Sequence, residues 1–230
     1  LLPKVMARVH AVDIFRKGSK ARSTREYAYP ALFRQVVQPD SDYILVPGHT
    51  SENRNYIPFG FFTRDDIVGN SSFAIPGATL FHFGVISSKM HMAWVSVTCG
   101  RLESRYRYSK DIVYNNFPWP DQSPPQQSSA GKREEKAREA IEQAAQAVLD
   151  ARAKFPDATL AALYDPLTMP PTLVKAHQAL DRAVDAAYGK RTFNSDAERV
   201  AFLFERYQQL TSLLPAATKK TTRKRKGSGD

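Results

Sequence analysis

Hydrophobic and polar residues follow two different patterns along this chain, and the pattern changes near its middle. Before residue 118, short apolar runs rich in aromatic and β-branched residues are bounded by Pro, Gly, Asn and Asp, which is typical of strands. After residue 131 the chain is rich in Ala, and its apolar residues recur at helical spacing. The segment 118–131 consists largely of Pro, Gln, Ser and Gly, which predicts a linker because this composition cannot bury a core.

The first part is predicted to open with a helix and to continue with short strands. The helix is indicated by apolar residues at helical spacing, which are Val5, Val9, Val12 and Phe15, and Gly18 can end it in the left-handed conformation. Extended segments are predicted over residues 32–37, 43–47, 56–62 and 79–85. A second helix is predicted over residues 88–99, with Ser87 or Ser88 as its N-cap, Gly100 at its end, and an apolar stripe of Met90, Trp94 and Val97.

The second part is predicted to be three helices that pack into a small bundle. The first covers residues 132–154, and the second covers residues 172–188 and ends at Gly189. One face of the second helix carries Leu173, Ala176, Leu180, Val184 and Ala187, and we expect His177 on its polar side to be a surface residue. The third opens with a capping box from Ser195 to Glu198 and buries Val200, Leu203, Phe204 and Tyr207.

These patterns predict an α+β fold, with short strands and at least two helices in a mixed domain, a small α-helical bundle and a disordered basic tail. The expected boundaries are residues 1–120 for the mixed domain, 121–131 for the linker, 132–212 for the helical domain and 213–230 for the tail. A length of 230 residues is ample for a hydrophobic core.

Charge changes this picture because it lies at the two ends of the chain. The formal charge is +10, yet residues 1–25 hold seven Lys/Arg and one Asp, and residues 219–230 hold six Lys/Arg and one Asp. Such an excess indicates an anionic partner, although a basic run is also typical of a solvated face or a loose tail. Phosphate contacts are expected from the first run, at Lys17, Lys20, Arg22 and Arg25.

Several classes of protein are excluded or disfavoured. No run of 18 apolar residues exists, the start of the chain is unlike a signal peptide, and the single Cys99 excludes an internal disulfide, so we expect a cytoplasmic protein. No metal-binding spacing of histidines is present, and no phosphate-binding loop or nucleophile elbow. The tetrapeptide Ser123-Pro-Pro-Gln126 lacks the aromatic residue of amine-methylating enzymes, so we expect no catalytic residue and no cofactor in this chain.

The stretch 101–110 has the pattern of a base-reading strand. In an extended conformation Glu103, Arg105 and Arg107 project from one face, while Ser104, Tyr106 and Tyr108 face the other way. Arg can bind guanine O6 and N7, and Glu can accept from the cytosine amino group. The alternative is an exposed Glu–Arg ion pair on a strand, and spacing alone favours that alternative.

Several long strings resemble the target recognition domain of MmeI-like (type IIL) restriction-modification enzymes and their DNA methylase relatives. They include Met90-His-Met-Ala-Trp94, Tyr106-Arg-Tyr-Ser109, Val113-Tyr-Asn-Asn-Phe-Pro-Trp-Pro120, Tyr43-Ile-Leu-Val-Pro47 and Ser51-Glu-Asn-Arg-Asn-Tyr-Ile-Pro58. Further on, Met169-Pro-Pro171 and the residues from Ala176 to Gly189 resemble the helical C-terminal domain of the same enzymes. The resemblance covers roughly residues 1–210.

The resemblance implies that this chain reads a short asymmetric site in double-stranded DNA. The family transfers a methyl group from S-adenosylmethionine to adenine, so the implied partner is a methylase catalytic domain or subunit. The family's base-reading positions match Gly48, Asn70, Ser71, Glu103, Arg105 and Arg107 here. Gly48 has no side chain, so the neighbouring His49 is the expected reader at that place.

The sequence leaves three alternative functions open for the chain. It can be a sequence-specific DNA recognition module without a catalytic domain, or the C-terminal part of a complete adenine-specific DNA methyltransferase. It can also be a non-specific basic nucleic-acid binder, whose affinity would fall steeply with salt.

Overall fold

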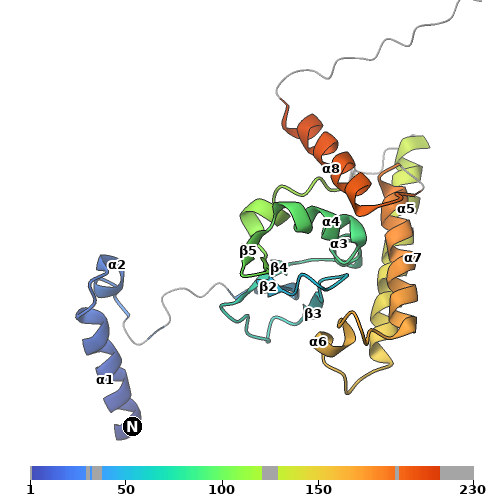
Figure 1. Ribbon diagram of the computed structural model, residues 1–230. Helices are drawn as coiled ribbons and strands as arrows, with labels where there is room; N and C mark the ends of the chain where they lie inside the picture. Colours follow the sequence, from blue (N-terminus) through green and yellow to red (C-terminus); the bar gives the residue numbers. More distant parts are fainter. Residues whose placement is uncertain (1, 30–31, 33–37, 121–128, 190–191, 213–230) are drawn as a thin grey trace, which may run out of the picture. The chain divides into compact units, whose positions relative to one another are not determined.

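The computed structural model describes residues 2–29, 32, 38–120, 129–189 and 192–212 (Figure 1). The chain divides into two compact units, residues 1–39 and residues 40–230. Residues 121–128 of the predicted linker and the whole predicted tail, residues 213–230, lie outside the described residues. The linker prediction is wrong for residues 129–131, which form the start of a helix.

The first unit contains two helices, α1 (Pro3–Lys17) and α2 (Arg22–Arg25). The predicted first helix is therefore confirmed, but its apolar residues are not buried, and Phe15 is 79% exposed. The expected left-handed conformation of Gly18 is wrong, because its φ is −81°. The Gly18 N–H still donates to the Ile14 carbonyl, so Gly18 ends the helix in a right-handed conformation. Of the strand predicted over residues 32–37, all but Leu32 lies outside the described residues.

Two small antiparallel sheets begin the second unit. The first has the order β3–β1–β4 and is formed by β1 (Tyr43–Pro47), β3 (Gly60–Phe62) and β4 (Ser72–Pro76). The second has the order β2–β6–β5 and is formed by β2 (His49–Thr50), β5 (Gly100–Leu102) and β6 (Arg105–Arg107). The strand predicted over residues 43–47 is confirmed, whereas only the last three residues of 56–62 are a strand.

The segment predicted as a strand over residues 79–85 is a helix, α3 (Leu80–Ile86). Thr79 and His82 form a reciprocal capping box at its start, and five of its seven residues are buried. A short apolar run that is buried all round cannot be told from a strand by periodicity, which explains the error. α3 packs very close to α5 (Ser129–Ala153), since a Cβ on Gly84 would lie 2.6 Å from Ile141 Cγ2.

The next helix, α4 (Lys89–Thr98), agrees with the prediction, and the Ser88 side chain caps it by accepting from the His91 N–H. Its end differs from the prediction, because Cys99 leaves the helix in an extended conformation and Gly100 begins β5. Val97, predicted to belong to the apolar stripe, is 49% exposed. A short π-helix, η1 (Lys110–Tyr114), follows β6 and is capped by Ser109.

The remaining helices are α5, α6 (Leu160–Leu163), α7 (Pro171–Ala187) and α8 (Asp196–Thr211). α5 and α7 lie side by side, while α8 packs mainly on α4 and α3 packs on α5 (Figure 1). Gly189 ends α7 with φ of +82°, and Ser195 caps α8 by accepting from Glu198 N–H, both as predicted. One hydrophobic core extends from Ile44 in β1 to Leu203 in α8, so the mixed α+β fold is confirmed. The domain boundaries stay a prediction.

Buried polar side chains connect the strand-rich part of this unit to the C-terminal helices. Arg152 of α5 donates to the Phe59 carbonyl at 2.7 Å and to the Tyr164 hydroxyl. The Tyr164 hydroxyl also bonds to His177 Nε2 at 2.7 Å. His177 is fully buried, so the prediction that it is a surface residue is wrong. Its ring stacks on the Tyr56 ring, with the ring centres 4.0 Å apart. The buried face of α7 is therefore wider than its apolar stripe.

Asp181 of α7 makes the second polar connection. Its carboxylate accepts from the Tyr56 hydroxyl at 2.7 Å and from the Lys89 N–H at the start of α4, also at 2.7 Å. Burial raises the pKa of Asp181 to about 6, although both hydrogen bonds act in the opposite direction.

We expect Arg152→Met to lower the free energy of unfolding by about 1–3 kcal/mol, because the buried Phe59 carbonyl and Tyr164 hydroxyl lose their donor. The matched control is Arg138→Met on the same helix, where the exposed ion pair with Glu142 contributes at most about 1 kcal/mol. Urea denaturation measures both. Equal losses in the two variants would contradict the role of Arg152 as a buried connector.

We expect the protein to lose stability as pH falls below about 6.5. Burial lowers the pKa of His91 and of His177 to about 3, so between pH 6.5 and 3 the unfolded chain binds protons that the folded chain does not. The raised pKa of Asp181 opposes this loss between about pH 6 and 3.8, since there the folded state holds the extra proton. His91→Gln should flatten the dependence of unfolding free energy on pH in this window. An unchanged dependence in His91→Gln would show that burial of this imidazole does not cause the loss.

Candidate nucleic-acid interface

Backbone hydrogen bonds at Gly48 bring the three predicted base-reading segments together. The Gly48 N–H donates to the Ser71 carbonyl, and the Gly48 carbonyl accepts from the Tyr108 N–H, both at 2.9 Å. The next residue, His49, pairs with Arg107 in the β2–β6 ladder. Gly48, Ser71 and Arg107 therefore belong to one edge of the second unit.

Gly48 is required at this edge because the two backbones approach closely. A Cβ at this position would lie 2.5 Å from the Ser71 carbonyl oxygen, far inside contact distance. Gly48 is itself buried, whereas His49 beside it is exposed. Asn70 and Ser71 are exposed in a turn closed by a bond from the Ser72 N–H to the Gly69 carbonyl at 3.0 Å. Of these residues, His49, Asn70 and Ser71 present side chains to solvent.

The β5–β6 hairpin presents two arginines on one face. Arg105 and Arg107 are exposed, and Tyr106 between them is buried, so the predicted alternation is confirmed for these residues. Tyr108 is buried on the same side as Tyr106, but Ser104 is exposed in the turn. The exposed face thus carries two planar groups suited to guanine edges.

The expected place of Glu103 in the strand is wrong. Leu102 pairs with Arg105, so Glu103 and Ser104 form a two-residue hairpin turn, and Glu103 has φ of +57°. Tight hairpin turns need a positive φ, which moves this residue out of the strand alternation. Its carboxylate still reaches Arg105, with Oε2 and Nη2 2.7 Å apart. An exposed ion pair such as this one contributes at most about 1 kcal/mol to stability. Little free energy is therefore lost when Glu103 and Arg105 leave each other to bind a ligand.

Two more charged residues of this edge escaped prediction. The Arg101 guanidinium lies 4.1 Å from the centre of the Tyr106 ring and donates to the Ser104 carbonyl at 2.9 Å. Glu52 lies near the same turn: a backbone N–H and the Ser104 hydroxyl, helped by Arg101 and Arg105, lower the pKa of its carboxyl. Arg101 could have been suspected from the basic stretch, whereas no sequence signal connects Glu52 to the hairpin.

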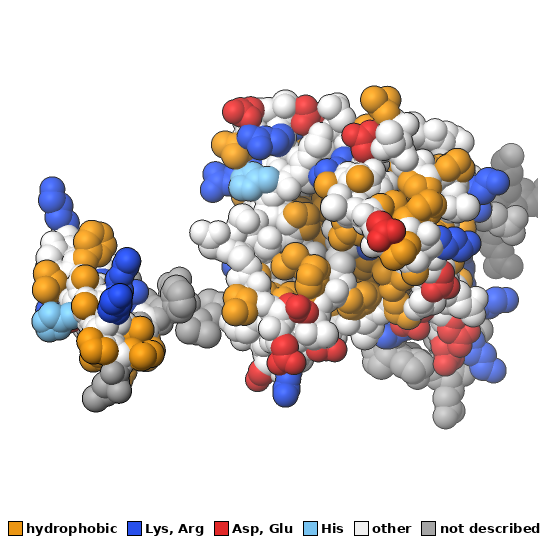
Figure 2. All heavy atoms as spheres, turned by 90° about the horizontal axis from the view of Figure 1, so that it is seen from below, with side chains coloured by type: hydrophobic (Ala, Val, Ile, Leu, Met, Phe, Trp, Pro, Cys, Tyr) orange, Lys and Arg blue, Asp and Glu red, His pale blue; other side chains and the backbone are white. Residues whose placement is uncertain are grey.

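The surface of the second unit therefore carries mixed charge at this edge. On the face of the second unit drawn in Figure 2, Lys and Arg side chains lie beside a histidine, with acidic side chains near them. Within the described residues there is no group of three or more His, Cys, Asp or Glu side chains that could hold a metal ion. The edge that contains Gly48, Ser71 and Arg107 therefore exposes both hydrogen-bond donors and acceptors, which suits the binding of a polar ligand.

Comparison with known proteins assigns the chain to a family. Residues 1–121 match the family model for the MmeI target recognition domain, and residues 133–215 match that for the MmeI C-terminal domain. The chain belongs to the MmeI target recognition domain family. The resemblance inferred from the sequence is thereby confirmed.

Two relatives of this recognition domain are much longer than the present chain. DNA methyltransferase A of Bacillus subtilis (strain 168) is 37% identical over 210 residues, which are 91% of this chain and 22% of that protein. A solved structure of the type IIL restriction-modification enzyme MmeI in complex with DNA is 48% identical and superposes with a TM-score of 0.81, over 91% of this chain and 27% of that one. The chain spans about a quarter of each relative.

The predicted phosphate-binding residues of the recognition domain all lie in its first unit and are exposed. Lys17 pairs with Asp13 and Arg22 pairs with Glu26, each at 2.9 Å. Arg25 donates to the Ser19 and Lys20 carbonyls, and the Lys20 side chain is exposed. Ion pairs in such exposed positions are weak, so these cations stay accessible to phosphate.

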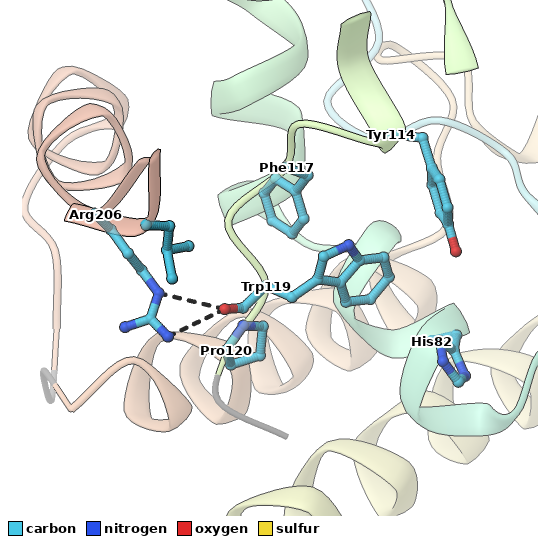
Figure 3. Close-up of a pocket in the computed structure, with 7 residues that line it drawn as sticks. His82, Tyr114, Phe117, Trp119, Pro120 and Arg206 are labelled. Atoms are coloured by element: carbon cyan, nitrogen blue, oxygen red, sulfur yellow. Dashed lines mark hydrogen bonds between the residues drawn. The ribbon is translucent and has the colours of Figure 1, made fainter. Parts of the chain in front are cut away.

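A pocket of about 490 Å³ lies between α3, η1, α8 and the segment leading to Pro120 (Figure 3). Its walls are His82, Tyr114, Phe117, Trp119, Pro120, Arg206 and Leu210. Arg206 donates from Nε and Nη2 to the Trp119 carbonyl at 3.3 and 3.2 Å, which connects this segment to α8.

No helix among the described residues is long and apolar enough to cross a membrane.

We expect Gly48→Ala to lower the free energy of unfolding by about 1–3 kcal/mol, because the added methyl group forces Ser71 away from the edge. The control is Gly69→Ala in the adjacent turn, where a Cβ meets nothing within 4 Å. Urea denaturation gives the energies, and hydrogen exchange at the Tyr108 amide should accelerate in Gly48→Ala alone. Matching behaviour of the two variants would show that the close approach at Gly48 is unimportant.

Proposed function

We propose that this chain is the sequence-reading part of an S-adenosylmethionine-dependent DNA adenine methyltransferase from a restriction-modification system. Its ligand is double-stranded DNA. The observation that carries the proposal is the convergence at Gly48, where His49, Ser71 and the arginine face of β6 meet at one exposed edge. Membership of the target recognition domain family supports the same conclusion.

In this proposal the edge reads bases in the major groove. Arg105 and Arg107 bind guanine O6 and N7, and Glu103 accepts from the amino group of the paired cytosine. Asn70 can bind adenine through N6 and N7, while Ser71 and His49 supply single hydrogen bonds. Gly48 contributes no side chain and permits the close packing on which the edge depends.

Binding energy that is independent of sequence comes from the first unit. Lys17, Lys20, Arg22 and Arg25 contact phosphates and set the position of the protein along the duplex. For Lys17 and Arg22, these contacts replace exposed ion pairs with Asp13 and Glu26. Because exposed ion pairs are weak, this replacement costs little free energy.

The methyl transfer itself belongs to the rest of the enzyme. A methylase catalytic domain or subunit holds S-adenosylmethionine, and this chain supplies the target sequence to it in the cytoplasm. The matched segment is 22% of the Bacillus relative, which is named as a DNA methyltransferase, and this is consistent with such a division.

The test is selection of bound duplexes from a randomised library at fixed salt. We expect the full 230-residue chain to enrich one short motif, and Glu103→Lys with Arg105→Asp to enrich a motif changed at a single base pair. The exchange reverses the charges of the pair but keeps the hairpin, since Lys tolerates the turn about as well as Glu. Each bidentate contact contributes about 1–3 kcal/mol of discrimination.

Arg22→Gln is the control for phosphate binding. It should weaken binding to every duplex alike and reduce the slope of log affinity against log salt by about one unit, with no change of motif. If the wild-type chain enriches no motif, it is a non-specific basic binder. If the double variant enriches the wild-type motif, Glu103 and Arg105 do not read bases.

A further inference from the structure

Tyr108 connects the candidate reading edge to the hydrophobic core through one bond on each side. Its N–H donates to the Gly48 carbonyl, and its hydroxyl bonds to His91 Nε2 at 2.9 Å. Tyr108 follows Arg107 directly, at the end of β6. The position of the reading arginine is therefore coupled to the position of α4, which carries His91.

The strands of the reading sheet are too short to hold their own orientation. β2 has two residues, and β5 and β6 have three each. A small isolated hairpin is marginally stable in water, so its orientation depends on what lies beneath it. Here Tyr106 and Tyr108 of this region are buried in the core, where Tyr108 contacts His91 of α4 and the Phe59 ring.

α4 is a firm support for this sheet. Trp94 Nε1 donates to the Val113 carbonyl at 3.0 Å, and the Trp94 ring contacts Phe204 and Tyr207 of α8 at 5.3 and 5.8 Å. His91 is fully buried, with the Phe117 ring edge-on at 4.7 Å. The Tyr108 hydroxyl thus meets an imidazole whose place is set by packing on several sides.

The hydrogen bond between Tyr108 and His91 is well suited to fix the orientation of β6 relative to α4. Both groups are buried, and burial keeps His91 neutral by lowering its pKa and keeps Tyr108 protonated by raising its pKa. His91 Nδ1 has no hydrogen-bond partner among the described residues, and the Tyr108 hydroxyl is the partner of Nε2 there. A directional bond in this dry environment resists rotation of β6 against α4.

We propose that Tyr108 is a positioning residue for base readout, which aims Arg105 and Arg107 through its hydrogen bond to His91. The proposal rests on the proposed function. Direct readout needs side chains held within about 0.5 Å and 10–20° of the productive geometry. Removal of the hydroxyl lets β6 tilt, so both arginines lose bidentate geometry while their charges remain.

The primary test is Tyr108→Phe, measured by duplex selection and by binding to the selected and a random duplex. We expect discrimination at the base pairs read by Arg105 and Arg107 to fall about tenfold, the order of one bidentate contact. The affinity for random duplex and its dependence on salt should stay the same, because the phosphate-binding cations are untouched.

Tyr164→Phe is a matched control. It also removes a buried tyrosine hydroxyl that bonds to a buried histidine, His177 Nε2, but in the polar network around Arg152. We expect it to cost at least as much stability as Tyr108→Phe and to leave the motif and its discrimination unchanged. A merely structural role for Tyr108 would make the two variants behave alike.

Variants at His91 give a second line of test if Tyr108→Phe does not fold. Gln can place an amide near Nε2 and keep a bond to Tyr108, so His91→Gln should retain discrimination. His91→Leu cannot form this bond and should lose discrimination about tenfold, as Tyr108→Phe does. Circular dichroism and thermal unfolding confirm that each variant compared is folded.

The outcomes separate the two proposals. A wild-type chain that enriches no motif overturns the proposed function. A wild-type motif that Tyr108→Phe or His91→Leu preserves with undiminished discrimination overturns the positioning role and leaves the proposed function intact. Equal loss of discrimination in Tyr164→Phe also overturns the positioning role, because the effect then follows from lost stability.

Discussion

The candidate interface depends on the two backbone hydrogen bonds of Gly48. The β1–β4 ladder runs to Pro47 and Ser72, and the bond from the Gly48 N–H to Ser71 continues it by one step. The Gly48 carbonyl then receives the Tyr108 N–H, at the point where the second sheet begins. A side chain at this junction would meet the Ser71 carbonyl, so the absence of a Cβ is what allows the two sheets to meet.

The residues exposed at this edge are supported by residues that never reach it. Loops and short strands carry binding groups best when a rigid scaffold holds them, and here that scaffold is α4 with the C-terminal helices behind it. Trp94 joins α4 to α8, and Asp181 of α7 accepts from the Lys89 N–H where α4 starts. The helical part of the chain therefore supports this edge, although it contributes none of the predicted base-reading residues.

Much of the fold could be predicted where the sequence signal is long or local. The helices α4, α5, α7 and α8 have clear apolar periodicity, and Ser88 and Ser195 cap two of them as expected. The errors occur where burial on all sides removes periodicity, as in α3, or where a polar residue finds partners in the core, as at His177. Glu103 was misplaced for a different reason, since a two-residue turn, and not the strand pattern, sets its conformation.

The sequence by itself determined the family, the alternation of Arg105 and Arg107 about a buried tyrosine, and the concentration of basic residues in the first unit. These features are properties of short segments and of residue type, so they can be seen without a fold. Only the tertiary structure decided that Gly48, Ser71 and Arg107 share one edge, and that His91 lies under Tyr108. Those contacts join segments far apart along the chain, and they form because packing of the common core brings the segments within hydrogen-bonding distance.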